Sequence, residues 1–267
     1  AELEATLRGF FSGAVRTFKS AHPAQAARCQ FPARWSWLSR ELNIAEADIP
    51  ASTCAEFEKF RERSRARSTT LIFSSYNTSN PASTFGHSLL RLNRGLHGEK
   101  SSSPLLDMGI NYAANPTTTN PILYALFGIT GTFPGTFSAL PYFYKVREYS
   151  DFDSRDLWEY DLNLKQEEID LLVAHLWELG FTHFDYYFFT ENCSYHMLSV
   201  LDVAAPRLSL LDKIPYWVIP IDTIKAAWRT PGLVKDVVYR PSLYKQFMAR
   251  LERLRSEDEE RVFDTAV

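Results

Sequence analysis

Three short β-rich runs follow one another in the middle of the chain, and helical patterns flank them on both sides. The runs are TTLIFSSY from Thr69, FGHSLLRLN from Phe85 and LLDMGINYAA from Leu105, with turn-rich or Ser-rich segments between them. Short apolar runs that are bounded by turn residues are typical of strands. We expect the second and third runs to form a hairpin with a long loop. Strands enclosed by helices in this order predict an α+β fold.

The patterns divide the chain into three parts. Residues 1–67 are interpreted as a helical N-terminal extension, residues 68–240 as the core that carries the strands, and residues 241–267 as a charged C-terminal helix. The chain has 267 residues, of which 45% are hydrophobic, so it can bury one large core together with such an appendage.

Two helices are expected in the N-terminal extension. They cover residues 33–42 and the segment from Thr53 to Ala66. Thr53 and Glu56 have the spacing of a capping box, in which two side chains accept hydrogen bonds from the first backbone N–H groups of a helix. The mixed-charge run EFEKFRERSRAR at the end of this segment is interpreted as a solvated helix face.

A second group of elements follows after residue 150. The alternating segment LWEYDLNL predicts a strand, and Asn163 with Gln166 has the spacing of a helix start. Leucine, valine and tryptophan then recur at helical spacing up to Gly180, which predicts a helix. Pro215 and Pro220 mark a loop farther along the chain.

One stretch of the core carries no charged side chain, from Met108 to Tyr144. Its second half, ILYALFGITGTFPGTFSALPYFY, is interrupted by three glycines and is too broken for a membrane helix. We expect an apolar loop or broken helix that lines an acyl pocket, rests on a membrane surface or closes over the site as a lid. The alternative is that this segment is simply buried.

Charge and hydropathy exclude two classes of function. The 29 basic and 32 acidic side chains give a net charge of -3, which argues against nucleic acid as the partner. No uninterrupted apolar run is long enough for a transmembrane helix. The aromatic content of 14% instead favours broad apolar packing and an apolar or amphiphilic ligand.

The chain has three cysteines, and two of them, Cys29 and Cys54, belong to the N-terminal extension. A disulfide between them would tie its helical segments together and would indicate an oxidising compartment such as the periplasm. Two buried free thiols in a reducing compartment are equally compatible with the composition. In either case Cys193 is left without an obvious partner.

Cys193 is expected in the first turn of an apolar helix, because Thr-Glu-Asn directly precedes it in FDYYFFTENCSYHMLSVLDVA. A thiol at a helix N-terminus feels the positive end of the helix dipole and unpaired N–H groups, which favour the thiolate. An imidazole would complete the activation of a nucleophile. The alternative is a buried structural thiol.

Two of the six histidines are the main candidates for that imidazole. His87 follows a glycine and begins an apolar strand, where a polar side chain needs a partner. His196 comes three residues after Cys193 and shares its helix face.

Other chemistries lack their motifs. Cys193, His196 and His183 do not have the spacing of a zinc site, there is no GxSxG elbow, and no Gly-rich segment continues into Lys and Ser or Thr. We therefore predict neither a metal nor a cofactor.

Several segments, in this order, resemble one protein family. They are NPASTFGHSLLRLN, INYAANP, PGTFSALPYFYKVREYSDFDSRDLWEYDLNL and FDYYFFTENCSYHMLSVLD. Together they resemble the Lnb N-terminal periplasmic domain family over roughly residues 70–210, and RCQFPARW resembles the N-terminal extension of its proteobacterial members.

The same order resembles the circularly permuted papain-like fold of lecithin retinol acyltransferase and the NlpC/P60 relatives, in which a histidine strand precedes the cysteine helix. This resemblance implies that Cys193 in the Asn-Cys motif is the nucleophile and that His87 in the Gly-His motif is the base. The residue that orients the histidine normally lies on the next strand, where Asn111 and Asp107 are available and Asn111 is preferred. The sequence lacks the second histidine that acyltransferase relatives use there.

For function, the resemblance implies a lipoprotein N-acyltransferase. Such an enzyme takes a fatty acyl chain from a phospholipid and places it on the α-amine of a diacylglyceryl-cysteine lipoprotein. We expect a phospholipid donor, a lipoprotein acceptor, a membrane surface as partner and a periplasmic, membrane-associated location. The uncharged stretch from Met108 to Tyr144 would receive the acyl chain.

Two alternatives stay open. A cell-wall amidase or peptidase of the NlpC/P60 type would keep the fold but would need a polar groove. A non-catalytic binding module of the envelope would leave Cys193 as a structural thiol.

Overall fold

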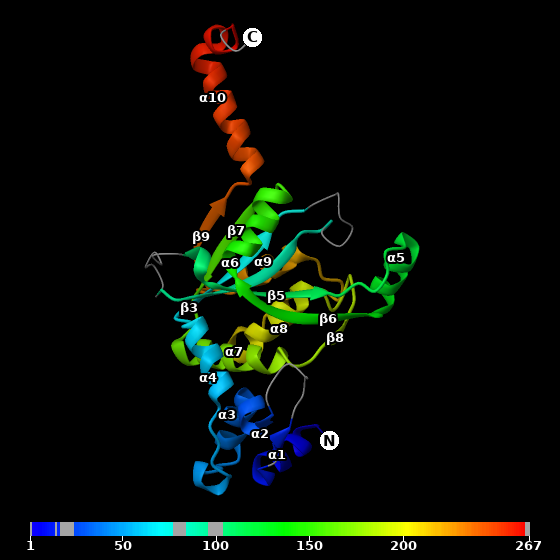
Figure 1. Ribbon diagram of the computed structural model, residues 1–267, viewed down its shortest axis with the longest axis vertical. Helices are drawn as coiled ribbons and strands as arrows, with labels where there is room; N and C mark the ends of the chain where they lie inside the picture. Colours follow the sequence, from blue (N-terminus) through cyan, green and yellow to red (C-terminus); the bar gives the residue numbers. More distant parts are fainter. Residues whose placement is uncertain (1, 14, 17–23, 77–83, 96–103, 265–267) are drawn as a thin grey trace.

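The computed structural model describes residues 2–13, 15–16, 24–76, 84–95 and 104–264. A central sheet forms the body, helices cover it, the N-terminal helices lie at one end and the last helix, α10 (Leu243–Asp264), stands away from the other (Figure 1). This mixture of helices and an antiparallel sheet confirms the predicted α+β class.

The described part of the chain contains a seven-stranded sheet in the order β8-β6-β5-β4-β3-β7-β9, and all neighbouring strands are antiparallel. The strands are β3 (Ser68–Ser74), β4 (His87–Asn93), β5 (Met108–Ala114), β6 (Phe133–Pro141), β7 (Leu157–Leu162), β8 (Phe184–Tyr186) and β9 (Val234–Arg240). The three predicted β-rich runs are β3, β4 and β5, and the expected hairpin is the β4–β5 pair.

Alternation along the strands gives the sheet two apolar faces. Leu71 and Leu90 belong to the large core, to which α7, α8 and α9 contribute, whereas Ile72 and Leu89 belong to a smaller cluster with Tyr142 from α6. Successive side chains of a strand point to opposite faces, so neighbours in sequence enter different clusters.

Helices from the second half of the chain pack on these two faces or lie next to them. They are α6 (Tyr142–Val146), the π-helix η4 (Arg147–Phe152), α7 (Gln166–Leu179), α8 (Cys193–Ala204) and α9 (Pro220–Trp228).

The N-terminal extension is a set of short helices with a small core of its own, formed by Phe10, Leu38 and Ile49. Its elements are α1 (Glu2–Ser12), β1 (Val15–Arg16), β2 (Gln25–Ala26), α2 (Ala27–Gln30), α3 (Pro32–Glu41), η1 (Glu46–Asp48) and α4 (Ala55–Ser64). The helix expected at residues 33–42 is α3, displaced by one residue.

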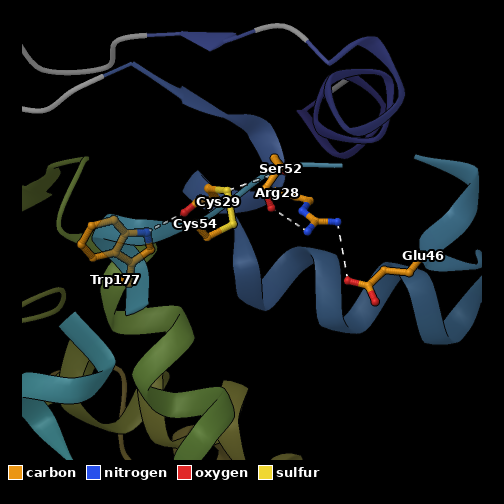
Figure 2. The surroundings of a disulfide bond; sticks show 6 residues. All are labelled: Arg28, Cys29, Glu46, Ser52, Cys54 and Trp177. Carbon is orange, nitrogen blue, oxygen red and sulfur yellow. Dashed lines mark hydrogen bonds and ion pairs between the residues drawn. A yellow bond between two sulfur atoms is a disulfide. The ribbon is translucent and has the colours of Figure 1, made fainter. Parts of the chain in front are cut away.

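Cys29 and Cys54 form a disulfide, which resolves the two alternatives that the composition left open (Figure 2). Beside it, the indole N–H of Trp177 in α7 donates a 2.8 Å hydrogen bond to the carbonyl of Cys29. The backbone N–H of Arg34 donates to the buried carboxylate of Glu178 in the same helix. The disulfide therefore lies where the extension docks onto α7.

The predicted capping box of α4 is wrong. The N-cap residue is Cys54, and it makes no side-chain capping bond. Glu56 instead accepts a hydrogen bond from Lys59 one turn farther on.

The predicted cap of α7 is also wrong, although the helix itself is present. Lys165 is the N-cap residue, and its backbone N–H donates to Glu168. The Asn163 amide donates instead to the carbonyl of Gly232, because the chain before β9 passes next to it.

The uncharged stretch is more regular than a loop or a broken helix. It comprises β5, α5 (Pro121–Thr130), β6 and most of α6. Two prolines and one glycine in β6 are the reason that its sequence does not predict a strand. Gly135 is required by packing, because a Cβ there would lie 2.1 Å from the Tyr112 hydroxyl oxygen. The sequence patterns likewise did not predict α9 and β9, and Pro220 begins α9 rather than lying in a loop.

No helix among the described residues combines the length and the apolar character that crossing a membrane requires.

Candidate active site

Asn192 sets the start of α8 and thereby the position of Cys193. Its side-chain oxygen accepts hydrogen bonds from the backbone N–H groups of Ser194, at 3.0 Å, and Tyr195, at 3.4 Å. Its amide nitrogen donates to the carbonyls of Phe188 and Val218. This side chain therefore caps the helix and ties it to the two loops beside it, as the Thr-Glu-Asn signal indicated.

The Gly86-His87 turn brings the backbone of β4 against β3. Gly86 has a φ of +93°, and a Cβ at this position would lie 2.7 Å from the carbonyl oxygen of Ser74 and 2.9 Å from the ring of Phe73. Only glycine fits both the dihedral angle and the space. The turn places the His87 side chain at the first position of β4.

His87 contacts Asn111 through one ring nitrogen and Cys193 through its other side. The distance from His87 Nε2 to Asn111 Oδ1 is 2.6 Å. Because an amide oxygen only accepts hydrogen bonds, Nε2 of His87 carries a proton. The imidazole is also hydrogen-bonded to the Cys193 thiol, and Nδ1 is the ring nitrogen left for that bond. The structure thus brings together Cys193, His87 and Asn111 from three different elements.

The surroundings of Cys193 favour its thiolate. Burial raises the pKa of the thiol, but the charge and hydrogen bond of His87 and the backbone N–H of Ser88 outweigh it and lower the pKa to about 7. These contacts therefore favour the thiolate although the residue is only 2% exposed.

Tyr186 is a neighbour of the thiol that the sequence analysis did not single out. Its hydroxyl accepts a hydrogen bond from the backbone N–H of Cys193 and is also hydrogen-bonded to the sulfur. Burial raises the pKa of the Tyr186 hydroxyl well above its usual value. Its ring stacks on Tyr112 with centroids 5.5 Å apart. The aromatic run before Cys193 signalled a strand here, but no motif marks this hydroxyl.

His196 packs in the core, so it is not the imidazole partner of Cys193 that the sequence analysis considered. Its ring packs against Tyr112, with centroids 4.0 Å apart, and against Phe184. Its Nε2 has no hydrogen-bond partner among the described residues, and burial lowers its pKa to about 4. It is therefore a neutral core imidazole at physiological pH.

Asp107 also lies outside the site. Its carboxylate accepts a hydrogen bond from the backbone N–H of Arg94, at the far end of β4 from His87. Asn111 lies farther along the chain, within β5, and its side chain is the one that reaches the imidazole.

A second layer of side chains supports the histidine. The Arg155 guanidinium is 1% exposed and donates a 2.6 Å hydrogen bond to the carbonyl of Ser75, just after β3. It lies over the ring of Tyr149, 4.7 Å from the centroid, and that ring is 5.8 Å from the ring of His87. The end of β3 is thus held against the Gly86-His87 turn.

Cys193 opens into a cavity of about 720 Å³. Tyr186, Phe188 and Phe189 line it on the side of β8, and Tyr124, Ala125 and Ile129 line it from α5. The volume is within the range of small-molecule sites, and the walls are mostly apolar. A thiol next to an imidazole at such a cavity can accept an acyl group whose hydrocarbon part lies on the apolar walls.

No group of three or more metal-ligating side chains comes together among the residues that the structure describes.

Two family models match the chain. The Lnb N-terminal periplasmic domain matches residues 56–230, which include His87, Asn111 and Cys193. A domain of unknown function (DUF7843) matches residues 1–41, in the N-terminal extension. No curated protein and no solved structure matches.

Proposed function

This chain belongs to the Lnb N-terminal periplasmic domain family, and from that premise we propose that it is a cysteine-dependent acyltransferase of the cell envelope. The family indicates a periplasmic location, and the Cys29–Cys54 disulfide is consistent with an oxidising compartment. The donor in this proposal is a phospholipid, and the acceptor is the N-terminal amine of a lipoprotein.

One observation carries the proposal: an ionisable thiol, an imidazole and an amide lie in hydrogen-bonded order at the wall of an apolar cavity. His87 holds the proton, and Asn111 fixes the ring through Nε2 so that Nδ1 faces the sulfur. A binding module has no need for a thiol with a pKa lowered to about 7.

In the first half-reaction the Cys193 thiolate attacks the carbonyl carbon of the phospholipid ester. A C–S bond forms, and the carbonyl π electrons move to oxygen. The Tyr186 hydroxyl, which lies beside the sulfur and accepts a hydrogen bond from the backbone N–H of Cys193, is the donor for this oxyanion. As the tetrahedral intermediate collapses, the C–O bond to glycerol breaks, and the His87 imidazolium protonates the departing oxygen. A lysophospholipid leaves, and the acyl group stays on sulfur as a thioester.

In the second half-reaction the acceptor amine attacks the thioester carbonyl. His87, now neutral, takes the proton from the amine while the C–N bond forms. The C–S bond then breaks and returns the thiolate next to the imidazolium. The cycle uses no cofactor, and its product is an amide.

We further propose that the core is a permuted papain-like fold. Its support is the order of the parts: the histidine strand β4 and the strand of Asn111, β5, precede the cysteine helix α8, which packs against both. In ordinary papain-like enzymes the cysteine helix comes first.

A cell-wall amidase of the NlpC/P60 type would use the same three residues. It would have to hold a peptide with several polar groups, whereas aromatic and aliphatic side chains line most of the cavity next to Cys193. The lining therefore favours a fatty acyl group over a peptide.

The test is to find the acyl-enzyme. The protein is incubated with phospholipid in mixed micelles, digested and analysed by mass spectrometry. We expect the peptide that contains Cys193 to gain the mass of one acyl chain, which hydroxylamine removes, and Cys193→Ala to gain none. Parallel incubation with peptidoglycan fragments tests the amidase. Peptide release there, without any acyl adduct from phospholipid, would overturn the proposal.

A further inference from the structure

Helix α5 exposes apolar side chains to solvent on the side opposite its packed face. Ile122, Leu123, Leu126 and Ile129 are 79%, 41%, 50% and 58% exposed. In Figure 1 the helix stands out from the body beyond the ends of β5 and β6. No charged residue occurs anywhere between Met108 and Tyr144, so this helix has no charged face to turn toward water.

The helix is nevertheless held firmly at its base. Gly128 lies so close to Phe188 that a Cβ there would be 2.2 Å from its ring, and the Phe188 backbone N–H donates a 2.8 Å hydrogen bond to the carbonyl of Gly128. Asn120 caps its first turn. The exposure of the apolar side chains is therefore a property of the fixed fold.

Aromatic side chains continue this surface around the mouth of the cavity. Phe85 is 48% exposed, and its ring is 6.1 Å from that of Phe189, which in turn is 5.5 Å from the ring of Trp217. Trp217 and Tyr216 are themselves exposed. We call the exposed Phe85, Tyr216 and Trp217, together with the four residues of α5, the apolar rim.

The rim is continuous with the wall of the cavity that contains Cys193. Phe85 and Ile129 belong to both: each lines the cavity, and each is about half exposed. Hydrocarbon can therefore pass from the outer surface to the sulfur along side chains that are mostly apolar.

We propose that the apolar rim docks on a phospholipid bilayer, with α5 and Trp217 among the lipid chains and the cavity mouth facing the membrane. The choice of lipid as the occupant rests on the proposed function. Three features support it: the surface is a protruding helix rather than a groove, it lacks charge, and Trp and Tyr border it as they do at membrane interfaces. In this position an acyl chain of a phospholipid reaches Cys193 without crossing water.

Vesicle flotation with a matched pair of variants tests this surface. Leu126 of the rim and Leu42 at the end of α3 are equally exposed, at 50% and 52%, and both are changed to Glu. The vesicles are made of phosphatidylethanolamine and phosphatidylglycerol in a 3:1 ratio, so that their surface carries a moderate negative charge. We expect wild type and Leu42→Glu to float with the vesicles and Leu126→Glu to bind at least tenfold more weakly, since a carboxylate replaces a side chain buried in lipid.

A soluble donor separates docking from catalysis. With a short-chain phospholipid below its micelle concentration, we expect Leu126→Glu to acylate Cys193 at the wild-type rate, and with vesicles at least tenfold more slowly. Wild type that is acylated by the soluble donor but does not float would overturn the docking surface and leave the proposed function intact. Floating that depends on Leu126, with no acylation by either donor, would support docking and overturn the proposed function.

A second copy of the chain is the other occupant to test. A dimer that forms without lipid in light-scattering measurements, and that Leu126→Glu dissociates, would show that the rim binds a second copy and would overturn the proposal.

Discussion

Cys29 in the N-terminal extension and Cys193 at the start of α8 are equally buried, at 1% and 2% exposure, yet their chemistry differs. Cys29 lies next to a second sulfur and a hydrogen-bonded Trp177, and it forms a disulfide. Cys193 lies next to the His87 imidazole, the backbone N–H of Ser88 and the Tyr186 hydroxyl, and its thiol has a lowered pKa. The neighbours of a sulfur, rather than its burial, separate a structural role from a reactive one.

The largest expected effect comes from removing the imidazole. His87→Ala should lower the rate of Cys193 acylation by about a thousandfold, because both the ion pair and the proton donor are lost. Acylation is measured by mass spectrometry over time. His196→Phe is the contrast: it removes a core imidazole whose Nε2 has no partner among the described residues, and the rate should stay within a few fold of wild type. Equal losses in the two variants would contradict the assignment of His87.

Removing a single hydroxyl should have the next largest effect. Tyr186→Phe is expected to lower acylation by about a hundredfold, as the loss of one oxyanion donor does. Alkylation of Cys193 by iodoacetamide forms no oxyanion and should change little at a pH where the thiol is fully ionised in both proteins. Tyr112→Phe is the matched control, because its ring stacks on Tyr186 while its hydroxyl has no hydrogen-bond partner among the described residues. A normal acylation rate in Tyr186→Phe would exclude the hydroxyl from the reaction.

The pH dependence of alkylation measures the thiolate directly. With the pKa of Cys193 lowered to about 7, the rate in wild type should be nearly constant above that pH and fall about tenfold for each pH unit below it, as the sulfur is protonated. In His87→Ala the burial that raises the pKa is no longer opposed by the imidazole, so the curve should shift to higher pH. An unshifted curve would mean that His87 does not activate the thiol.

The smallest effect on turnover is expected at the disulfide. The double variant Cys29→Ser with Cys54→Ser should acylate Cys193 within about twofold of wild type, while the free energy of unfolding falls by about 3 kcal/mol, since the bridge closes a 25-residue separation. Denaturant unfolding and the acylation assay measure the two quantities on one sample. A large loss of acylation with an unchanged fold would show that the extension contributes to the site.

Local patterns predicted the parts of the site that depend on neighbouring residues. The start of α8 follows from Thr-Glu-Asn before an apolar helix, and Asn192 does cap it. The glycine before His87 and the β-rich run after it similarly predicted β4. These signals act within one turn of helix or a few residues of strand, where the chain itself brings the groups together.

Other features depend on pairing between distant segments and had no local signal. Strand β6 contains two prolines and a glycine, and it is a strand because β5 and β8 pair with it on either side. Tyr186 stands in a run of aromatic residues, and nothing in the local sequence distinguishes it from its neighbours. The choice between Asn111 and Asp107 depended on which of the two lies next to the imidazole, and strand pairing places Asn111 of β5 there.

The amino-acid sequence by itself determined the α+β class, the cysteine at the first turn of a helix and the histidine at the first position of a strand, since each depends on residues close together in the chain. Only the tertiary structure decided that a sulfur and an imidazole 106 positions apart are hydrogen-bonded, that Asn111 rather than Asp107 contacts the ring, and that α5 presents its apolar face outward. Those contacts are set by the packing of α8 on the sheet and by strand pairing, which no short window of sequence contains.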